Sequence, residues 1–505
     1  MDFKKVEKKW QERWEKSKVF EANVNPKNKK FLTSLIIPYV NGNIHIGHSF
    51  TYTRTDAYAR FKRMQGFNVC LAQGFHATGE PIIGTVKRLK KGDKAQIDTF
   101  RIYGATDKDI KRFETGGAEE VARFWTEKII ETENSIGFSI DWRRKFITAI
   151  YPTFNRFIEW QYNTLRKKGY VIQGTHPVIW CPYDQSPTGD HDRLKGEGES
   201  PIEFTILKFK FKDMYICAAT LRPETVFGQT NMWANPDVNY QIVLVNGKEK
   251  WVVSKECADK LKDQLKKVEV VGSIKGKEML GKYCTAPIIK KEIIILPAPF
   301  CDPKIGTGLV TSVPSHAPFD WQALIDLKNN PSALKKYGIS PDLLKGVNPI
   351  SIIKVEGFSE HPAEDMIKKL NIKHQGEFEK LKEALHTIYT KEHHTGIMKT
   401  NCGEYSGLPV KEVKEKIKKH LLKEDFGDSM WEPTDEVVCR CTNKCHVKIL
   451  ENQWFLKFSD KEWKGKVKQC IAQMKFYPEE ARTQFVNTVD WLDDKACARK
   501  SGLGT

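Results

Sequence analysis

Two histidines at the expected start of a helix are the first residues in this chain that could do chemistry. The sequence His45-Ile46-Gly47-His48 follows an apolar run and a turn, and precedes a stretch with helical periodicity. A helix N-terminus attracts phosphate through its free backbone N–H groups and its dipole. Histidine rings can donate hydrogen bonds to phosphate oxygens, and Gly47 leaves room for a nucleotide. For an isolated H-x-x-H, surface histidines or a metal site would be the ordinary explanation, so the surroundings must decide.

The segments around these histidines predict a βαβ unit. Residues 31–37 form an apolar run ended by Pro38, which predicts a buried strand. Residues 46–65 predict a helix that Gly66 terminates, and residues 67–72 predict a second short strand. This order of elements is typical of a parallel sheet. The expected fold class is therefore α/β, with ligands bound beyond the carboxyl ends of the strands.

The stretch from Pro38 to His48 resembles the HIGH signature of class I aminoacyl-tRNA synthetases, residue for residue at His45–His48. The resemblance implies a Rossmann-like catalytic domain in which His45, Gly47 and His48 serve catalysis and ATP binding, with ATP used as its Mg²⁺ complex. The two histidines would stabilise charge on an α-phosphate attacked by a carboxylate. The other residues of this region are Pro38, Tyr39, Asn41, Gly42, Asn43, Ile44 and Ile46.

A second block, from Phe75 to Ile82, directly follows the second expected strand. It resembles the F/W-H-x-T-G-x-P-I block of archaeal and eukaryotic cytosolic leucyl-tRNA synthetases, which implies leucine as substrate and tRNA(Leu) as partner. Because aromatic walls suit a branched apolar side chain, Tyr39, Phe75 and His76 are predicted to form the leucine pocket. The alternatives are core packing for Phe75, a structural role for His76, and an isoleucyl or valyl specificity.

Two further motifs lie in a region of short β-rich runs that begins near residue 200. Thr220–Thr225 reads T-L-R-P-E-T, and Gly306–Asp320 begins with G-T-G. Together they resemble the editing domain inserted into leucyl, isoleucyl and valyl synthetases. An activation pocket discriminates a near-isostere by only ~1–3 kcal/mol, so a second, hydrolytic site is needed. The resemblance implies that Asp320 holds the α-ammonium of the mischarged amino acid, and the alternative is a surface aspartate that caps a helix. The predicted editing residues are Thr220, Arg222, Thr225, His316 and Asp320.

Cysteines cluster at one place in the sequence, where Cys439, Cys441 and Cys445 precede His446. Three thiolates and an imidazole could form a Cys₃His zinc site, although the spacing is cramped. The segment resembles the C-R-C-x-x-x-C block of archaeal leucyl-type enzymes, which favours a structural role. Zinc and reduced, unmetallated thiols explain the cluster equally well. Cys181 has no partner cysteine nearby in the sequence, so we expect its segment to be a degenerate zinc site.

Composition limits the class of protein without identifying it. Lys and Arg total 82 against 64 Asp and Glu, a net charge of +18. A polyanionic partner and a Lys-rich surface of the thermophile kind explain this surplus equally well. Twelve cysteines in a chain with no export signal indicate a reducing compartment, so we expect a cytoplasmic protein. No apolar run reaches membrane-spanning length.

Three regions are expected along the chain. Residues 1–200 would form the N-terminal half of the catalytic domain with helical and zinc-like insertions. Residues 201–430 would form the editing domain, with a β-rich core and a Lys-rich helical part. Residues 431–505 would carry the cysteines and return to the catalytic domain.

The second class I signature, KMSKS, has no match in the sequence. We therefore expect the N-terminal part of a leucyl-type enzyme that activates leucine, charges tRNA(Leu) and edits mischarged tRNA. A second synthetase subunit would supply the KMSKS and anticodon-binding domains. A truncated chain and an incomplete gene model are the alternatives. The other functions considered are a stand-alone aminoacyl-tRNA deacylase and a non-catalytic tRNA-binding module.

Overall fold

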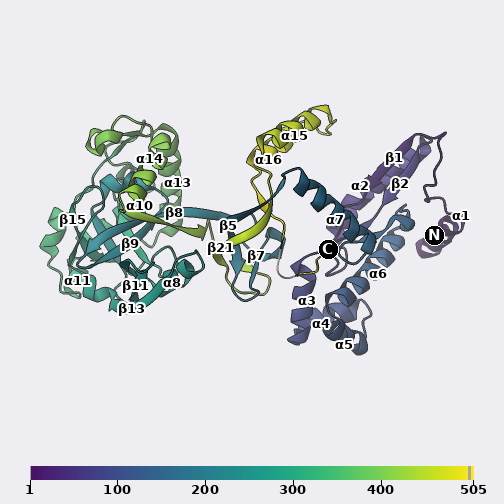
Figure 1. The fold of residues 1–505 in the computed structure, drawn as a ribbon, viewed down its shortest axis with the longest axis horizontal. Coiled ribbons are helices and arrows are strands. Elements are labelled where there is room, and N and C mark those ends of the chain that lie inside the picture. Colours follow the sequence, from purple (N-terminus) through teal and green to yellow (C-terminus); the bar gives the residue numbers. More distant parts are fainter. Residues whose placement is uncertain (1, 499–501, 505) are drawn as a thin grey trace.

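The computed structural model describes residues 2–498 and 502–504 of the chain. The first part of the chain forms an α/β body, and the middle part forms a β-rich body (Figure 1). A smaller sheet and a narrow pair of long strands lie between the two bodies (Figure 1). Within the described residues, no helix has the length and apolar content needed to cross a membrane.

The α/β body is built on the predicted βαβ unit. Strands β1 (Lys30–Ser34) and β2 (Asn68–Ala72) pair in parallel, and helix α2 (Ile46–Met64) connects them. Gly66 follows the helix at φ +81°, a conformation that glycine adopts without strain, and so ends α2 as expected. The predicted α/β class is confirmed, and the carboxyl end of β1 leads through a turn into the two histidines.

A group of helices packs together in one part of this body, and their apolar side chains form much of its core. Phe100, Phe113 and Trp125 are fully buried where three of these helices meet. Strands β3 (Gly74–Phe75) and β4 (Phe146–Ile147) form a second short parallel pair. The helices are α1 (Phe3–Ser17), α3 (Glu80–Lys90), α4 (Lys94–Ile102), α5 (Asp107–Gly116), α6 (Ala118–Ile136), α7 (Pro152–Lys167) and the 3-10 helix η1 (Trp142–Arg144).

The prediction of a buried strand over residues 31–37 was wrong in both length and burial. β1 ends at Ser34, and Leu32 and Ile36 are 76% and 64% exposed. The reason is that β1 pairs only with β2 among the described residues, so its second edge has no neighbouring strand. α7 is similarly uncovered: none of its residues is buried in the described structure, and Trp160 is exposed.

The β-rich body contains a ten-stranded sheet in the order β13-β11-β12-β9-β8-β14-β15-β10-β16, with β19 paired to β8. Trp233 and Trp251, which belong to its strands, are fully buried. Its strands are β8 (Pro201–Phe211), β9 (Met214–Thr220), β10 (Asn231–Ala234), β11 (Asn239–Val245), β12 (Glu249–Val253), β13 (Val268–Lys275), β14 (Tyr283–Thr285), β15 (Glu292–Pro297), β16 (Leu309–Ser312) and β19 (Gly427–Pro433).

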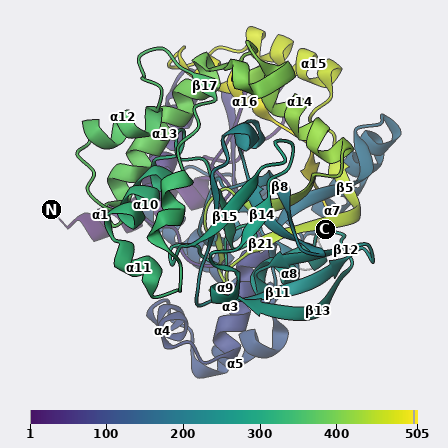
Figure 2. The ribbon, with the colours of Figure 1, turned by 90° about the vertical axis from the view of Figure 1, so that its left-hand side faces the viewer.

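Several helices of this body gather beside the strands β10 and β16. Helices α10 (Pro318–Asn329), α12 (Pro362–Lys369) and α13 (Phe378–Thr395) lie together on one side of the sheet (Figure 2). The remaining elements are η3 (Pro223–Gly228), α8 (Lys255–Lys262), α9 (Gly276–Met279), α11 (Pro331–Lys335), η4 (Pro341–Gly346), β17 (Ile353–Lys354), β18 (Ile397–Met398), η5 (Thr400–Tyr405) and α14 (Val410–Lys423).

The chain leaves and re-enters the β-rich body along paired strands. β8 and β19 are antiparallel, and Pro201 lies opposite Pro433. Beyond them, β5 (Val171–Cys181) pairs with β21 (His446–Leu456), and β7 (Arg193–Lys195) pairs with β20 (Val438–Cys439). The other elements here are β6 (Ser186–Pro187), η2 (Asp190–Asp192), α15 (Lys461–Gln473), α16 (Ala481–Trp491) and β22 (Lys495–Ala496).

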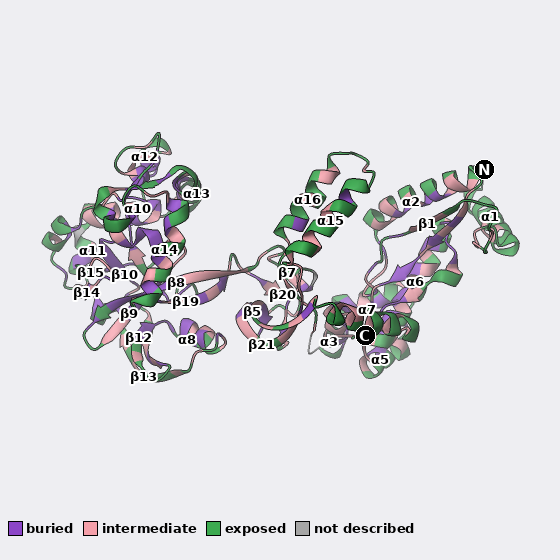
Figure 3. Ribbon diagram, turned by 45° about the horizontal axis from the view of Figure 1, so that its top comes forward, coloured by how far each residue is buried: buried purple, intermediate pink, exposed green. Residues whose placement is uncertain are grey.

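The end of the chain returns to the α/β body. Leu503 exchanges two backbone hydrogen bonds with Gly79, at 2.9 and 3.2 Å. Residues 499–501 and 505, which belong to the last expected region, lie outside the described residues. Buried residues concentrate in the sheet of the β-rich body and along α6, whereas α1 is largely exposed (Figure 3).

Candidate functional site

His45 and His48 close over the N-terminus of α2. His45 Nδ1 accepts a hydrogen bond from the Gly47 N–H at 3.1 Å, and His48 Nδ1 accepts one from the His45 N–H at 3.3 Å. The two ring centroids are 4.1 Å apart. Burial and then the neighbouring His45 lower the pKa of His48, so its ring is neutral at pH 7. The rings thus occupy backbone donors of the kind that bind phosphate at helix starts.

Close packing explains the glycine of this motif. A Cβ atom at residue 47 would lie 2.9 Å from His45 Cε1, so a larger residue would push the ring away. The preceding turn is fixed by Asn43, whose amide donates to Thr132 Oγ1 at 2.9 Å and whose Oδ1 accepts from the Ile44 N–H at 2.8 Å. Ile46, by contrast, is 87% exposed. The turn before the helix N-terminus is therefore held by hydrogen bonds, and Ile46 beside it is open to solvent.

The three residues predicted for the leucine pocket do not share one environment. Tyr39 and His76 form a stacked pair, with ring centroids 4.2 Å apart and an interplanar angle of 18°. Their backbones are bridged, since the His76 N–H donates to the Pro38 carbonyl at 2.8 Å. Phe75 is 0% exposed and belongs to the core of the α/β body. Tyr39 and His76 remain candidates for a pocket wall, whereas core packing accounts for Phe75.

The T-L-R-P-E-T motif folds around the backbone of Arg222. The Arg222 N–H donates to Thr220 Oγ1 at 2.9 Å, and Thr225 Oγ1 donates to the Arg222 carbonyl at 2.8 Å. The guanidinium Nε donates to Glu224 Oε1 at 2.8 Å. These contacts make a compact turn at the end of β9, in which both threonines are tied to one residue.

Asp320 lies in the first turn of α10, with its side chain almost buried at 6% exposure. Its Oδ1 accepts from the Trp233 ring N–H at 3.1 Å, and its Oδ2 accepts from the Val313 N–H at 2.9 Å. Burial raises the pKa of Asp320 to about 7, although both hydrogen bonds oppose the shift. Within the described part of the chain Asp320 forms no ion pair, and an ammonium group would supply the cation.

His316 connects the second motif to a residue that the sequence did not suggest. His316 Nδ1 lies 2.6 Å from Glu392 Oε1, and Arg222 Nη2 lies 2.6 Å from Glu392 Oε2. Glu392 belongs to α13, and the ring of Tyr389 on the same helix covers the Arg222 guanidinium at 4.2 Å. The structure thus joins the two motifs through α13. No pattern in the Lys-rich helical segment distinguishes Glu392 from its other carboxylates.

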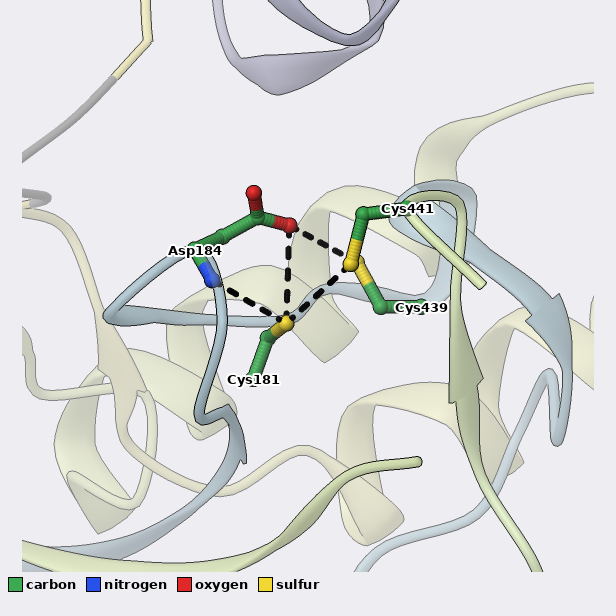
Figure 4. A group of neighbouring side chains, drawn as sticks. All are labelled: Cys181, Asp184, Cys439 and Cys441. Carbon is green, nitrogen blue, oxygen red and sulfur yellow. Dashed lines mark hydrogen bonds between the residues drawn. The ribbon is translucent and has the colours of Figure 1, made fainter. Parts of the chain in front are cut away.

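The cysteine site differs from the prediction in two of its four residues. Cys181, Asp184, Cys439 and Cys441 bring their ligand atoms within 4.8 Å of one another (Figure 4). Cys181 Sγ is 3.4 Å from Cys441 Sγ, and Asp184 Oδ2 is 3.1 Å from Cys439 Sγ. Tetrahedral zinc with Zn–S bonds of about 2.3 Å requires sulfur atoms roughly 3.8 Å apart, so the group is close to that geometry.

Two predicted ligands point elsewhere, and Cys181, which we expected to lie in a degenerate site, lies within the group instead. Cys445 Sγ lies 3.7 Å from Thr188 Oγ1, and His446 Nε2 lies 2.6 Å from Asp263 Oδ2. The chain turns sharply after Cys441 and enters β21, where successive side chains face opposite sides. Cys181 is brought to the site by β5, which pairs with β21, and this long-range pairing cannot be read from cysteine spacing.

The donor set fits a closed structural metal site. Zinc accepts thiolate and carboxylate ligands, and four protein ligands leave no open position for a substrate. The second oxygen of Asp184 lies 2.6 Å from Lys87 Nζ, which orients the carboxylate with Oδ2 toward the sulfur atoms (Figure 4). This arrangement can hold β5 and the cysteine turn together.

Comparison with known proteins gives the family. Residues 9–505 match the model of the tRNA synthetases of class I (I, L, M and V). The chain belongs to this family. Its members use ATP, typically with Mg²⁺. The HIGH-like helix start and the editing-like motifs therefore have the family context that their sequence resemblance suggested.

Relatives of the chain are leucine–tRNA ligases. The chain is 45% identical to the Pyrococcus abyssi enzyme, over 100% of this chain and 53% of that protein. It is 44% identical to the Archaeoglobus fulgidus enzyme, over 100% of this chain and 54% of that protein. The chain thus spans about half the length of these relatives. The crystal structure of the P. knowlesi cytosolic leucyl-tRNA synthetase editing domain is 19% identical, covers 45% of this chain and 96% of that chain, and has a TM-score of 0.41.

Proposed function

We propose that this chain is part of a leucyl-tRNA synthetase that activates leucine with ATP, transfers it to tRNA(Leu) and hydrolyses mischarged tRNA. The observation that carries the proposal is 45% identity to a leucine–tRNA ligase along the entire chain. The capped helix start of α2 supports the first step. An α-phosphate arriving there would displace His45 from the Gly47 N–H and gain that donor and both rings.

Exposed apolar side chains on the α/β body support the presence of a further part of the catalytic fold that packs on them. Leu32, Ile36, Phe157 and Trp160 are all more than half exposed, on β1, on the segment after it and on α7. Exposed apolar groups in such numbers indicate a missing contact. We propose that the region carrying the KMSKS and anticodon-binding domains covers them, on a second synthetase subunit as the sequence suggested.

Replacing His48 tests the activation site. In the enzyme assembled with the remaining part of its catalytic fold, His48→Ala should lower leucine-dependent ATP–pyrophosphate exchange by roughly tenfold or more, because a donor to the transition state is lost. His394→Ala, which removes an exposed histidine of the β-rich body, is the control and should exchange at the wild-type rate. Equal exchange rates in the two variants would contradict the proposed role of His48.

A second candidate function is hydrolysis of mischarged tRNA by this chain alone. The specific observation that favours it is Asp320, a nearly buried carboxyl whose pKa is raised to about 7 beside the T-L-R-P-E-T network. The α-ammonium of an aminoacyl ester would supply the missing cation, and binding would draw the carboxyl into its ionised form. Water attack on the ester carbonyl would then release the amino acid and free the tRNA.

Deacylation should depend on the ionisation of Asp320. With isoleucyl-tRNA(Leu), kcat/KM should fall as the pH drops below about 7, because a protonated carboxyl cannot pair with the ammonium group. Asp320→Asn should remove this acidic limb and lower kcat/KM by roughly tenfold or more. Asp342→Asn, at an exposed carboxyl, is the control. A wild-type chain that releases no isoleucine would rule out this second function.

We also propose that zinc binds at Cys181, Asp184, Cys439 and Cys441 as a structural ion. The purified chain should then contain about one zinc ion, and Cys181→Ser should lose it and melt at a lower temperature, because structural zinc contributes folding energy. Cys445→Ser changes a buried cysteine outside the group and should keep the metal. Metal content is measured by mass spectrometry. Zinc kept in Cys181→Ser but lost in Cys445→Ser would instead favour the ligand set suggested by the sequence.

A further inference from the structure

We propose that Glu392 on α13 is a positioning residue of the hydrolytic site, holding Arg222 and His316 so that the two motifs keep one geometry. The inference rests on the deacylase function proposed above and assigns α13 a role in it. Glu392 is 0% exposed and lies outside both motifs in the sequence. Its two carboxylate oxygens each lie 2.6 Å from one motif: Oε1 from His316 and Oε2 from Arg222.

The hydrogen bonds of His316 make it a link in this network. The Ile352 N–H donates to His316 Nε2 at 3.0 Å, so the ring proton sits on Nδ1 and is donated to Glu392. Both ring nitrogens are engaged and the ring is 0% exposed. His316 is therefore placed to transmit the position of Glu392 to the loop before α10, where the His316 N–H bonds the Val313 carbonyl.

Arg222 transmits the same position to the threonines. Its guanidinium is held by Glu224 at one side and by Glu392 at another, and it packs on the ring of Tyr389. Its backbone in turn bonds both Thr220 and Thr225. Displacing the guanidinium would move the backbone that fixes these two hydroxyl groups, and with them any water or ester they place.

Glu392 is a charged group at neutral pH. Burial alone would raise its pKa, but Arg222 and then His316 hold it below the usual value for glutamate. A buried ion pair is a weak source of net stability, because desolvation offsets much of the attraction. It does impose a specific geometry, since each partner is costly to leave unpaired. This favours a positioning role over simple packing for the carboxylate.

Asp320 accepts no hydrogen bond from Arg222, His316 or Glu392 themselves, and the network reaches it through the backbone of Val313, whose carbonyl accepts from the His316 N–H. Its hydrogen bonds come from Trp233 and Val313, not from Glu392. Loss of the Glu392 charge should therefore leave binding of the α-ammonium largely intact while disturbing the reacting ester. The expected signature is a lower kcat with a nearly unchanged KM.

The experiment uses the full chain and isoleucyl-tRNA(Leu). Glu392→Gln keeps the size of the side chain and should lower kcat by roughly tenfold, whereas KM changes little. Glu383→Gln, at an exposed carboxyl of the same helix, should behave as wild type. If Glu392 acts through Arg222, the double variant with Arg222→Gln should be no slower than the slower single variant. Effects that multiply in the double variant, or an unchanged kcat in Glu392→Gln, would overturn the inference.

Hydrogen exchange separates this inference from the proposed function. Amide exchange over residues 218–230 should be faster in Glu392→Gln than in wild type, and unchanged in Glu383→Gln. If the wild-type chain does not deacylate but exchange responds in this way, the deacylase function fails while the tethering of the loop stands. If exchange and kcat are both unchanged, the inference fails. If Glu392→Gln does not fold, Glu392→Asp retracts the charge by one methylene, and a folded variant with wild-type kcat and exchange would overturn the inference.

Discussion

Antiparallel pairing between the two chain segments that flank the β-rich body is the constraint on which the rest of the structure depends. β8 pairs with β19, β7 with β20, and β5 with β21, so segments more than two hundred residues apart run side by side. The pairing brings Cys181 to Cys439 and Cys441, and it fixes where the β-rich body begins and ends. Because each strand pair must be in register for the next to form, a local feature such as the cysteine cluster depends on a non-local ladder.

The two proposed reaction sites differ in where they bind charge: one binds a polyanion at the surface, and the other binds a cation in a buried position. The helix start of α2 holds backbone N–H groups at the surface under two histidine rings, where a highly charged, hydrated ligand can displace a ring and gain protein donors. The network around Asp320 and Glu392 is buried, so charge there must be matched within the protein or by the ligand. A surface site tolerates a polyanion that comes and goes, whereas a buried carboxyl with a raised pKa selects for a single cationic group.

How much could be predicted from the sequence depended on whether the deciding contact was local. The βαβ unit was predicted because apolar periodicity and Gly66 both act within a few residues. The place of the two histidines at a helix start was also predicted, from their position between a strand and a helix, whereas the capping of the backbone by their rings was not. The burial of β1 was mispredicted because an apolar run shows that a strand suits a buried position. It does not show whether another part of the chain covers the strand. Cys181 and Glu392 were missed because strand register and helix packing bring them to their sites from far along the chain.

The pairing of Pro201 with Pro433 also bears on how such a chain could have been assembled. Residues paired across an antiparallel ladder have Cα atoms only about 4.5–5.5 Å apart, which a turn of two residues can span. The remainder of the chain, which we call the host fold, therefore has two adjacent chain ends at the point where the β-rich body begins and ends. A genetic insertion or excision at this point changes a hairpin turn into a whole body, or back, without moving the strands on either side. Modularity of this kind follows from the strand geometry alone and requires no contact between the inserted body and the helices of the host.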